Sequence, residues 1–160
     1  MAADREKAGD GKLEAAGDDK IRLVARLSAD YMLRSLKMIG ELAEGELLTG
    51  LVNLALVQAN VGHLDPTGSP FDGLDSVPPD EVRRPVSVLS LSASLGLPYE
   101  TTRRHVAKMV ETGQCLRVKG GVVAPTAVVA DPRRSEMLEQ NLINLKRLYR
   151  NLRNAGVALD

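Results

Sequence analysis

The side chains best suited to chemistry lie mostly between residues 99 and 119, and they are hydrogen-bond donors rather than catalytic groups. Arginine and lysine donate to phosphates and to the edges of bases, and hydroxyl groups reach the same acceptors. Such residues are Tyr99, Thr101, Arg103, Arg104, Lys108, Arg117 and Lys119, with Arg84 before them. Their chemistry is recognition of a polar, anionic surface, and we interpret all of them as candidate contacts.

Few residues of the sequence have the type and spacing that catalysis or metal binding requires. His63, His105 and Cys115 lack the short spacings of a zinc site, and no third group orients a cysteine and histidine as a nucleophile pair. Gly120-Gly121 is not followed by the Lys-Ser/Thr of a phosphate-binding loop. We therefore expect no enzymatic activity, no metal and no cofactor. Cys115 is expected to pack where a helix meets a hairpin, although a redox-sensing thiol stays open.

The charge of the chain is unevenly distributed, although its formal net charge is zero. Residues 1–80 hold 8 Lys/Arg against 14 Asp/Glu, whereas residues 81–160 hold 13 against 7. Residues 83–134 alone hold nine basic and three acidic residues, so the positive excess gathers around the candidate contacts. A cationic surface binds polyanions by releasing their counterions. Taken singly, however, each exposed arginine or lysine is more often ordinary solvated surface.

Helical periodicity predicts two helices before these residues, at 20–39 and at about 41–60. Asp19 would cap the first helix, and Gly40 would end or bend it. The second is apolar on most sides, which is typical of a helix buried in a core or in a subunit interface. Residues 62–82 are rich in proline, glycine, aspartate and serine, and they predict a linker loop.

A short helix, a tight turn, a second helix and a hairpin follow. The helices are predicted at 87–96 and at 98–112, each ended by a glycine. Two triplets of strand-forming residues, 116–118 and 122–124, flank the sequence Lys-Gly-Gly at 119–121. Glycine there supplies the positive φ that a tight hairpin turn requires.

The helix predicted at 98–112 has two distinct faces. Its buried stripe is expected to comprise Thr102, Val106, Met109 and Val110, which leaves Glu100, Arg104, Ala107 and Lys108 opposite, flanked by Thr101 and Arg103. A helix fits the major groove of B-DNA, where arginine can donate two hydrogen bonds to guanine, so Arg103 and Arg104 are the leading base-contact candidates. Arg117 and Lys119 near the hairpin tip would touch the backbone or minor groove, and Tyr99 would either stack or simply pack on the turn.

A long helix is predicted from Asp131-Pro132 to about Ala155, with Gly156 as its stop. Its apolar residues are spaced alternately by four and three: Leu138, Leu142, Leu145, Tyr149 and Leu152. This spacing keeps one seam along a helix. The seam could pack on the first two helices of its own subunit, on the same helix of a second copy, or on both. A monomer whose outer helices merely complete one core stays open.

One segment resembles the DNA-binding unit of MarR-type and GntR-type bacterial regulators. In those families Leu-Ala-x-x-Leu-Gly-Val leads into Ser-x-x-Thr-Val-Arg. Here the segment reads Leu91-Ser92-x-x-Leu95-Gly96-Leu97, then Tyr99-Glu100-Thr101-Thr102-Arg103-Arg104-His105-Val106. Ser92 replaces the family's alanine, Leu97 its valine, Pro98 the serine that caps the second helix, and Thr102 the buried valine. The likeness covers about 40 of the 160 residues, and Arg103 falls on the arginine of the family motif.

The elements and the resemblance together predict a mainly α fold. Its centre would be a winged helix-turn-helix, with a three-helix core and a β-hairpin wing, extended by N-terminal and C-terminal helices. The expected segments are a disordered tail at 1–18, a helical pair at 19–61 for dimerisation or core, a linker loop at 62–82, a DNA-binding module at 83–130, and a C-terminal helix at 131–157, again for dimerisation or core.

The expected function is sequence-specific binding of double-stranded DNA by a homodimer that regulates transcription in bacteria. The resemblance implies dimerisation through the outer helices, which would place two recognition helices about one DNA turn apart on a pseudo-palindromic site. A winged-helix adaptor that binds another protein, without specific DNA binding, is the alternative. An apolar pocket for a small-molecule effector between the first two helices is left open beside ordinary core packing.

We expect a cytoplasmic protein with no membrane partner. The most apolar stretch, 47–57, is interrupted by Thr49, Gly50 and Asn53 and falls far short of the roughly 20 residues that span a bilayer. Residues 1–20 lack the pattern of a signal peptide, and a single cysteine fits a reducing compartment.

Overall fold

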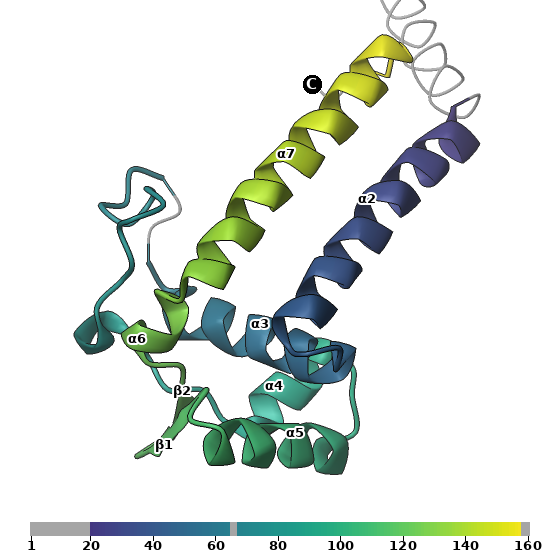
Figure 1. Cartoon of the computed structure of the whole chain (residues 1–160). Helices are drawn as coiled ribbons and strands as arrows, with labels where there is room; N and C mark the ends of the chain where they lie inside the picture. Colours follow the sequence, from purple (N-terminus) through teal and green to yellow (C-terminus); the bar gives the residue numbers. More distant parts are fainter. Residues whose placement is uncertain (1–19, 65–66, 158–160) are drawn as a thin grey trace, which may run out of the picture. The chain divides into compact units, whose positions relative to one another are not determined.

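The computed structural model describes residues 20–64 and 67–157. It is mainly helical with one two-stranded antiparallel hairpin, as predicted at the level of fold class (Figure 1). The described residues form two compact units: a central unit within Leu36–Glu139, and a terminal unit within Met1–Ser35 and Gln140–Asp160. The tail predicted at 1–18 and the cap predicted at Asp19 lie outside the described residues.

The break between the first two helices falls later than predicted. Helix α2 (Ile21–Leu42) continues through Gly40, and α3 (Leu47–Val61) begins well after residue 41. An end of the first helix at Gly40 is therefore wrong, and the alternative, a bend there, stays a prediction. The chain turns instead at Glu44 and Gly45, whose φ angles are 56° and 91°. Gly40 is buried because α3 packs next to this end of α2.

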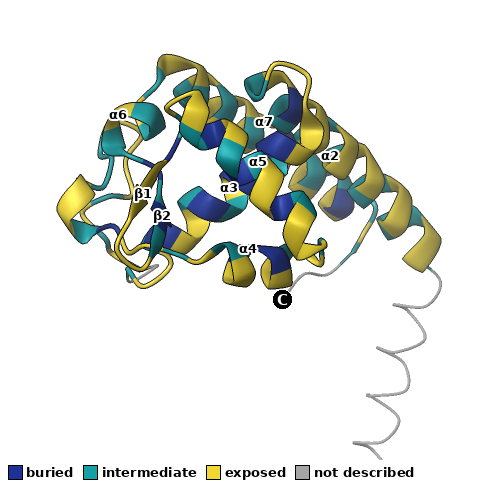
Figure 2. Ribbon diagram, turned by 90° about the horizontal axis from the view of Figure 1, so that it is seen from below, coloured by how far each residue is buried: buried dark blue, intermediate teal, exposed yellow. Residues whose placement is uncertain are grey.

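The apolar core of the central unit is shared by α3, α4 (Val88–Leu95), α5 (Tyr99–Glu111) and the second strand of the hairpin (Figure 2). Its buried members are Val52, Leu56, Leu91, Val106, Met109, Cys115, Val122 and Ala124. Helices α4 and α5 have the predicted limits to within a residue or two. Thr102, Val106 and Met109 are completely buried, which confirms most of the predicted inner stripe of α5; Val110 is half-buried.

Strands β1 (Leu116–Val118) and β2 (Gly121–Val123) pair with Val118 opposite Gly121. The second strand was predicted one residue too late, because only Lys119 and Gly120 form the turn. The other edge of β2 carries an unpredicted contact. Val86 forms an isolated bridge with Val122 through two backbone hydrogen bonds of 3.1 and 2.9 Å.

The region predicted as a linker, 62–82, joins elements that pack within one unit rather than two separate units. It contains a short 3-10 helix, η1 (Asp80–Val82), and a second unpredicted helix, α6 (Thr126–Val129), lies near it. The Asp80 carboxylate accepts hydrogen bonds from the backbone N–H (2.6 Å) and hydroxyl (2.8 Å) of Thr126, which lowers the pKa of Asp80. These bonds fasten the end of the predicted linker to α6.

In the terminal unit, the first part of α2 runs antiparallel to the second part of α7 (Pro132–Asn154) (Figure 1). Lys20 Nζ donates to the carbonyls of Ala155 (3.0 Å) and Gly156 (2.8 Å), and the Tyr31 hydroxyl donates to Asn141 Oδ1 (2.9 Å). The limits predicted for this last helix are confirmed, with Gly156 at φ 67° beyond its end.

The apolar seam predicted on α7 remains largely uncovered. Leu152 is 6% exposed, but Leu142, Leu145 and Tyr149 are 50%, 46% and 55% exposed. Packing between the two helices of the terminal unit therefore uses another face of α7, on which Asn144 is buried.

Among residues 20–64 and 67–157, no helix combines the length and apolar character that crossing a bilayer requires.

Candidate nucleic-acid interface

Helices α4 and α5 are joined by a tight turn with defined caps. Ser87 Oγ accepts a hydrogen bond from the N–H of Ser90 (3.0 Å) and so caps α4, while Gly96 ends it at φ 63°. Pro98 precedes α5 without a side-chain cap. Thr102, which replaces the valine of the family pattern, is fully buried, and its hydroxyl donates to the Pro98 carbonyl (3.3 Å). This bond satisfies a polar group that burial would otherwise penalise.

The outward face of α5 presents two arginines in different states. Arg103 is 47% exposed and makes two hydrogen bonds, of 2.9 and 2.5 Å, to the carboxylate of Glu100 on the same helix. These bonds lower the pKa of Glu100 and raise that of Arg103. Exposed pairs of this kind are weak, so Glu100 is a partner that another anion can replace. Arg104 is exposed, and its side chain makes no hydrogen bond or ion pair with the described residues.

The other candidate contacts on α5 differ in their exposure and in whether they already have a partner. Tyr99 is 49% exposed and Thr101 is half-buried. Lys108 forms an ion pair with Glu46, on the turn between α2 and α3, and this contact lowers the pKa of Glu46. Lys108 therefore already has an ion-pair partner within the protein, whereas Arg104 has none among the described residues.

The hairpin contributes exposed cations. Arg117 lies in β1 and Lys119 lies in the turn, and neither makes a hydrogen bond or ion pair with a described residue. In Figure 1 the hairpin and α5 lie at the same edge of the central unit. The predicted contacts of α5 and the hairpin therefore occupy neighbouring elements.

Arg83 and Arg84, adjacent in sequence, have opposite environments. Arg84 is exposed, whereas Arg83 is 6% exposed and donates from Nη2 to the Pro78 carbonyl (2.9 Å). Burial lowers the pKa of the Arg83 guanidinium, and the carboxylate of Asp80 lies 3.8 Å from its Nε. Arg83 is a structural residue, and only Arg84 remains available as a contact.

Cys115 lies in the core, as predicted, where α5 meets the hairpin. Burial raises the pKa of its thiol to about 11, so the thiol is protonated at neutral pH. A redox sensor needs the opposite, an accessible thiolate, so the environment of Cys115 does not favour that role. His105 Nδ1 lies 2.9 Å from Thr49 Oγ1. Within the described part of the chain, no three His, Cys, Asp or Glu residues are grouped as metal ligands.

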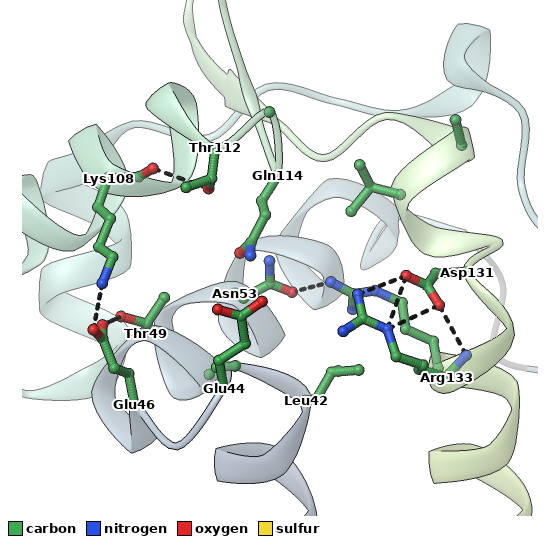
Figure 3. Close-up of a pocket in the computed structure, with 16 residues that line it drawn as sticks. Leu42, Glu44, Glu46, Thr49, Asn53, Lys108, Thr112, Gln114, Asp131 and Arg133 are labelled. Carbon is green, nitrogen blue, oxygen red and sulfur yellow. Dashed lines mark hydrogen bonds and ion pairs between the residues drawn. The ribbon is translucent and has the colours of Figure 1, made fainter.

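A polar cavity beside α5 was not predicted. It has a volume of about 450 Å³ and is lined by the turn between α2 and α3, by α3, by the end of α5, by α6 and by the start of α7 (Figure 3). The three residues that break the apolar pattern of α3, namely Thr49, Gly50 and Asn53, all line it. The interruption of the apolar pattern by these three residues was the sequence signal for the cavity. Spacing alone, however, does not show which other elements their side chains meet.

Comparison of the chain with protein-family models, with curated proteins and with solved structures finds no match. The case for a function therefore depends on the geometry and charge of the residues themselves.

Proposed function

We propose that this chain is a DNA-binding transcriptional regulator of the winged helix-turn-helix type that acts as a homodimer. Helix α5 would enter the major groove, and the hairpin formed by β1 and β2 would contact the backbone or the minor groove. The observation that carries the proposal is the outer face of α5. There Arg103 and Arg104 are exposed while the opposite face of the same helix is buried in the core.

The order of the elements supports this proposal. Helices α3, α4 and α5 share one core, and the hairpin follows α5 directly. Three packed helices followed by a β-hairpin are the parts of a winged helix-turn-helix. The bridge between Val86 and Val122 ties the hairpin to the segment before α4, which would hold the wing beside the recognition helix.

The electrostatics of the face support the same function. Arg104, Arg117 and Lys119 have no ion-pair partner among the described residues. A phosphate would therefore meet these cations without first displacing a carboxylate, whereas at Arg103 it would displace Glu100. Binding would follow the release of counterions from the DNA.

The exposed seam of α7 supports the homodimer. Its spacing by four and three is that of helices which pack in pairs, and within the terminal unit most of it is left uncovered. A second copy carries the same seam, so a twofold contact would bury Leu142, Leu145 and Tyr149 against their equivalents.

One observation favours the alternative function of a protein-binding adaptor. Leu116 and Val118, which lie on one face of β1, are 49% and 42% exposed, and exposed apolar side chains on an edge strand suit a protein partner. The adaptor would bind through the hairpin and would show no preference among DNA sequences.

The test compares two double variants in binding to a duplex selected from a random-sequence library by the wild-type protein. We expect Arg103→Ala with Arg104→Ala to weaken binding at least tenfold and to flatten the sequence preference, because each arginine bound to a base contributes about 1–3 kcal/mol of discrimination. Fluorescence anisotropy of the labelled duplex measures the affinity.

The matched control is Lys146→Ala with Arg147→Ala, an adjacent exposed cationic pair on α7, for which we expect less than a twofold change. Wild-type affinity should also fall by about 10³ to 10⁵ between 50 and 200 mM salt if 6 to 10 phosphates are contacted. Equal losses in the two double variants would show that α5 is not the reading element, and failure to select any duplex would overturn the function.

A further inference from the structure

Asn53, which lines the polar cavity of the central unit, has a buried donor without a hydrogen-bond partner among the described residues. It is 5% exposed, and its Oδ1 accepts a hydrogen bond of 2.5 Å from Nη2 of Arg134. Its Nδ2 is fully buried and has no partner among the described residues. A buried donor without an acceptor is costly, and native proteins nearly always supply one from the chain, from water or from a ligand. Asn53 lines the cavity, so an occupant is the available acceptor.

Arg134 adds a cation next to this donor. Its side chain is half-buried, and this burial lowers the pKa of its guanidinium. The nearest carboxylate in sequence, Asp131, is hydrogen-bonded to Arg133 at 2.9 Å (Figure 3). An amide N–H beside a partly desolvated guanidinium forms a favourable site for a carboxylate.

The acidic residues of the cavity differ in whether they already have a partner. Glu46 pairs with Lys108, and Asp131 pairs with Arg133, whereas the carboxylate of Glu44 makes no hydrogen bond or ion pair with a described residue. Glu44 lies in the turn between α2 and α3, with a φ of 56°. Its carboxylate interacts electrostatically with Arg133 but forms no ion pair with it, so the carboxylate is available to a further cationic group in the cavity.

The other two polar breaks in α3 have structural explanations that Asn53 lacks. A Cβ on Gly50 would lie 2.5 Å from the Ile39 carbonyl oxygen, so glycine is needed for the close contact between α2 and α3. Thr49 donates to Glu46 at 2.9 Å and also contacts His105. Among these three residues of α3, Asn53 alone has a buried polar atom that the described residues do not satisfy.

We propose that this cavity binds a small zwitterion, with its carboxylate on Asn53 and Arg134 and its ammonium group on Glu44. The volume of about 450 Å³ lies in the range of small-molecule sites. The cavity wall includes Lys108 at the end of α5, so an occupant contacts the helix that the proposed function places in DNA. A change in DNA affinity on binding depends on that proposed function, whereas binding itself does not.

Calorimetry on the full chain tests the site without DNA. The probes are the standard α-amino acids, tested individually, together with the α-keto acid (no ammonium group) and the primary amine (no carboxylate) that correspond to each one that binds. We expect at least one amino acid to bind, its keto acid to bind at least tenfold more weakly, and its amine not to bind.

Three variants assign the contacts. Asn53→Asp removes the donor and adds a negative charge, and we expect at least a tenfold loss of amino-acid affinity. Gln58→Glu makes the same charge change at an exposed position of α3, and we expect no change. Glu44 is exposed in a turn, so we expect Glu44→Gln to fold normally. We expect this variant to bind the amino acid only as tightly as the wild type binds the corresponding keto acid.

The result that overturns the inference is absence of binding by every amino acid, or binding that Asn53→Asp and Glu44→Gln both leave unchanged. Equal affinity for amino acid and keto acid in the wild type would overturn the contact with Glu44. A protein that binds amino acids in calorimetry but selects no duplex would retain this site and would lose the proposed function, so the two failures are distinct.

Discussion

Asn60 shows how much one polar residue contributes to this fold. It is completely buried at the end of α3, and its Nδ2 donates to the carbonyls of Arg84 (2.7 Å) and Val122 (3.2 Å). Its Oδ1 accepts from the N–H of Ala124 (2.9 Å). One side chain therefore satisfies backbone groups on both sides of the hairpin's attachment to the core.

Replacing Asn60 by leucine should be strongly destabilising. The Arg84 carbonyl and the Ala124 N–H would lose the partner that Asn60 supplies, whereas the Val122 carbonyl would keep the N–H of Val86. Each such loss costs about 1–3 kcal/mol, so we expect Asn60→Leu to lower the free energy of unfolding by about 2 kcal/mol or more. Urea denaturation measures it. Gln58→Leu, at an exposed position of the same helix, is the control, with an expected change within about 0.5 kcal/mol. Similar values for both variants would contradict the role assigned to Asn60.

At the scale of elements, the hairpin depends on how closely it approaches the strand-like segment before α4. Gly121 has φ 146°, and a Cβ built on it would lie 2.2 Å from the Val86 carbonyl oxygen. Gly120, in the turn, has φ 95°, but its nearest neighbour would be Pro85 Cβ at 3.9 Å. Both glycines meet a backbone requirement, and only Gly121 also meets a packing requirement.

These two glycines give a matched pair of variants. Gly120→Ala should cost about 1–2 kcal/mol through backbone strain alone. Gly121→Ala should cost clearly more, about 3 kcal/mol, because the new methyl group must also separate Val86 from Val122. Thermal and urea unfolding compare the two. If Gly120→Ala proved the more damaging, the bridge to Val86 would not be what holds the hairpin in place.

At the scale of the whole molecule, the exposed seam of α7 is the surface through which we propose that two copies associate. Leu142, Leu145 and Tyr149 lie on one helix at a spacing suited to a helical partner, and each is about half exposed. A DNA reader with one α5 per molecule recognises a short site, whereas a homodimer recognises two half-sites.

Sedimentation equilibrium tests the homodimer. We expect the wild type to sediment at about twice the 17.2 kDa mass of one chain and Leu145→Glu to sediment near that mass, because a buried glutamate would face its own copy. Leu89→Glu makes the same change at a 66% exposed leucine of α4, which is not part of the seam, and should remain dimeric. A wild type of single-chain mass at all concentrations would exclude the proposed dimer.

Local pattern was sufficient for much of this protein. The limits of α4, α5 and α7 and the inner stripe of α5 follow from apolar spacing and from glycines beyond helix ends, because both signals arise within a few residues of chain. The candidate contacts Arg103, Arg104, Arg117 and Lys119 were identifiable for the same reason, since charge on the outer face of a predictable helix or turn needs no distant partner.

Tertiary structure decided what depends on residues far apart in sequence. Lys108 and Arg83 look as free as Arg104 in the sequence, yet one pairs with Glu46 and the other is buried among 78–83 and 126. The bond between Asn53 and Arg134, with the cavity beside it, joins residues 81 positions apart. Sequence spacing predicts which side of an element a residue occupies, but the partner it meets there is set by how the elements pack.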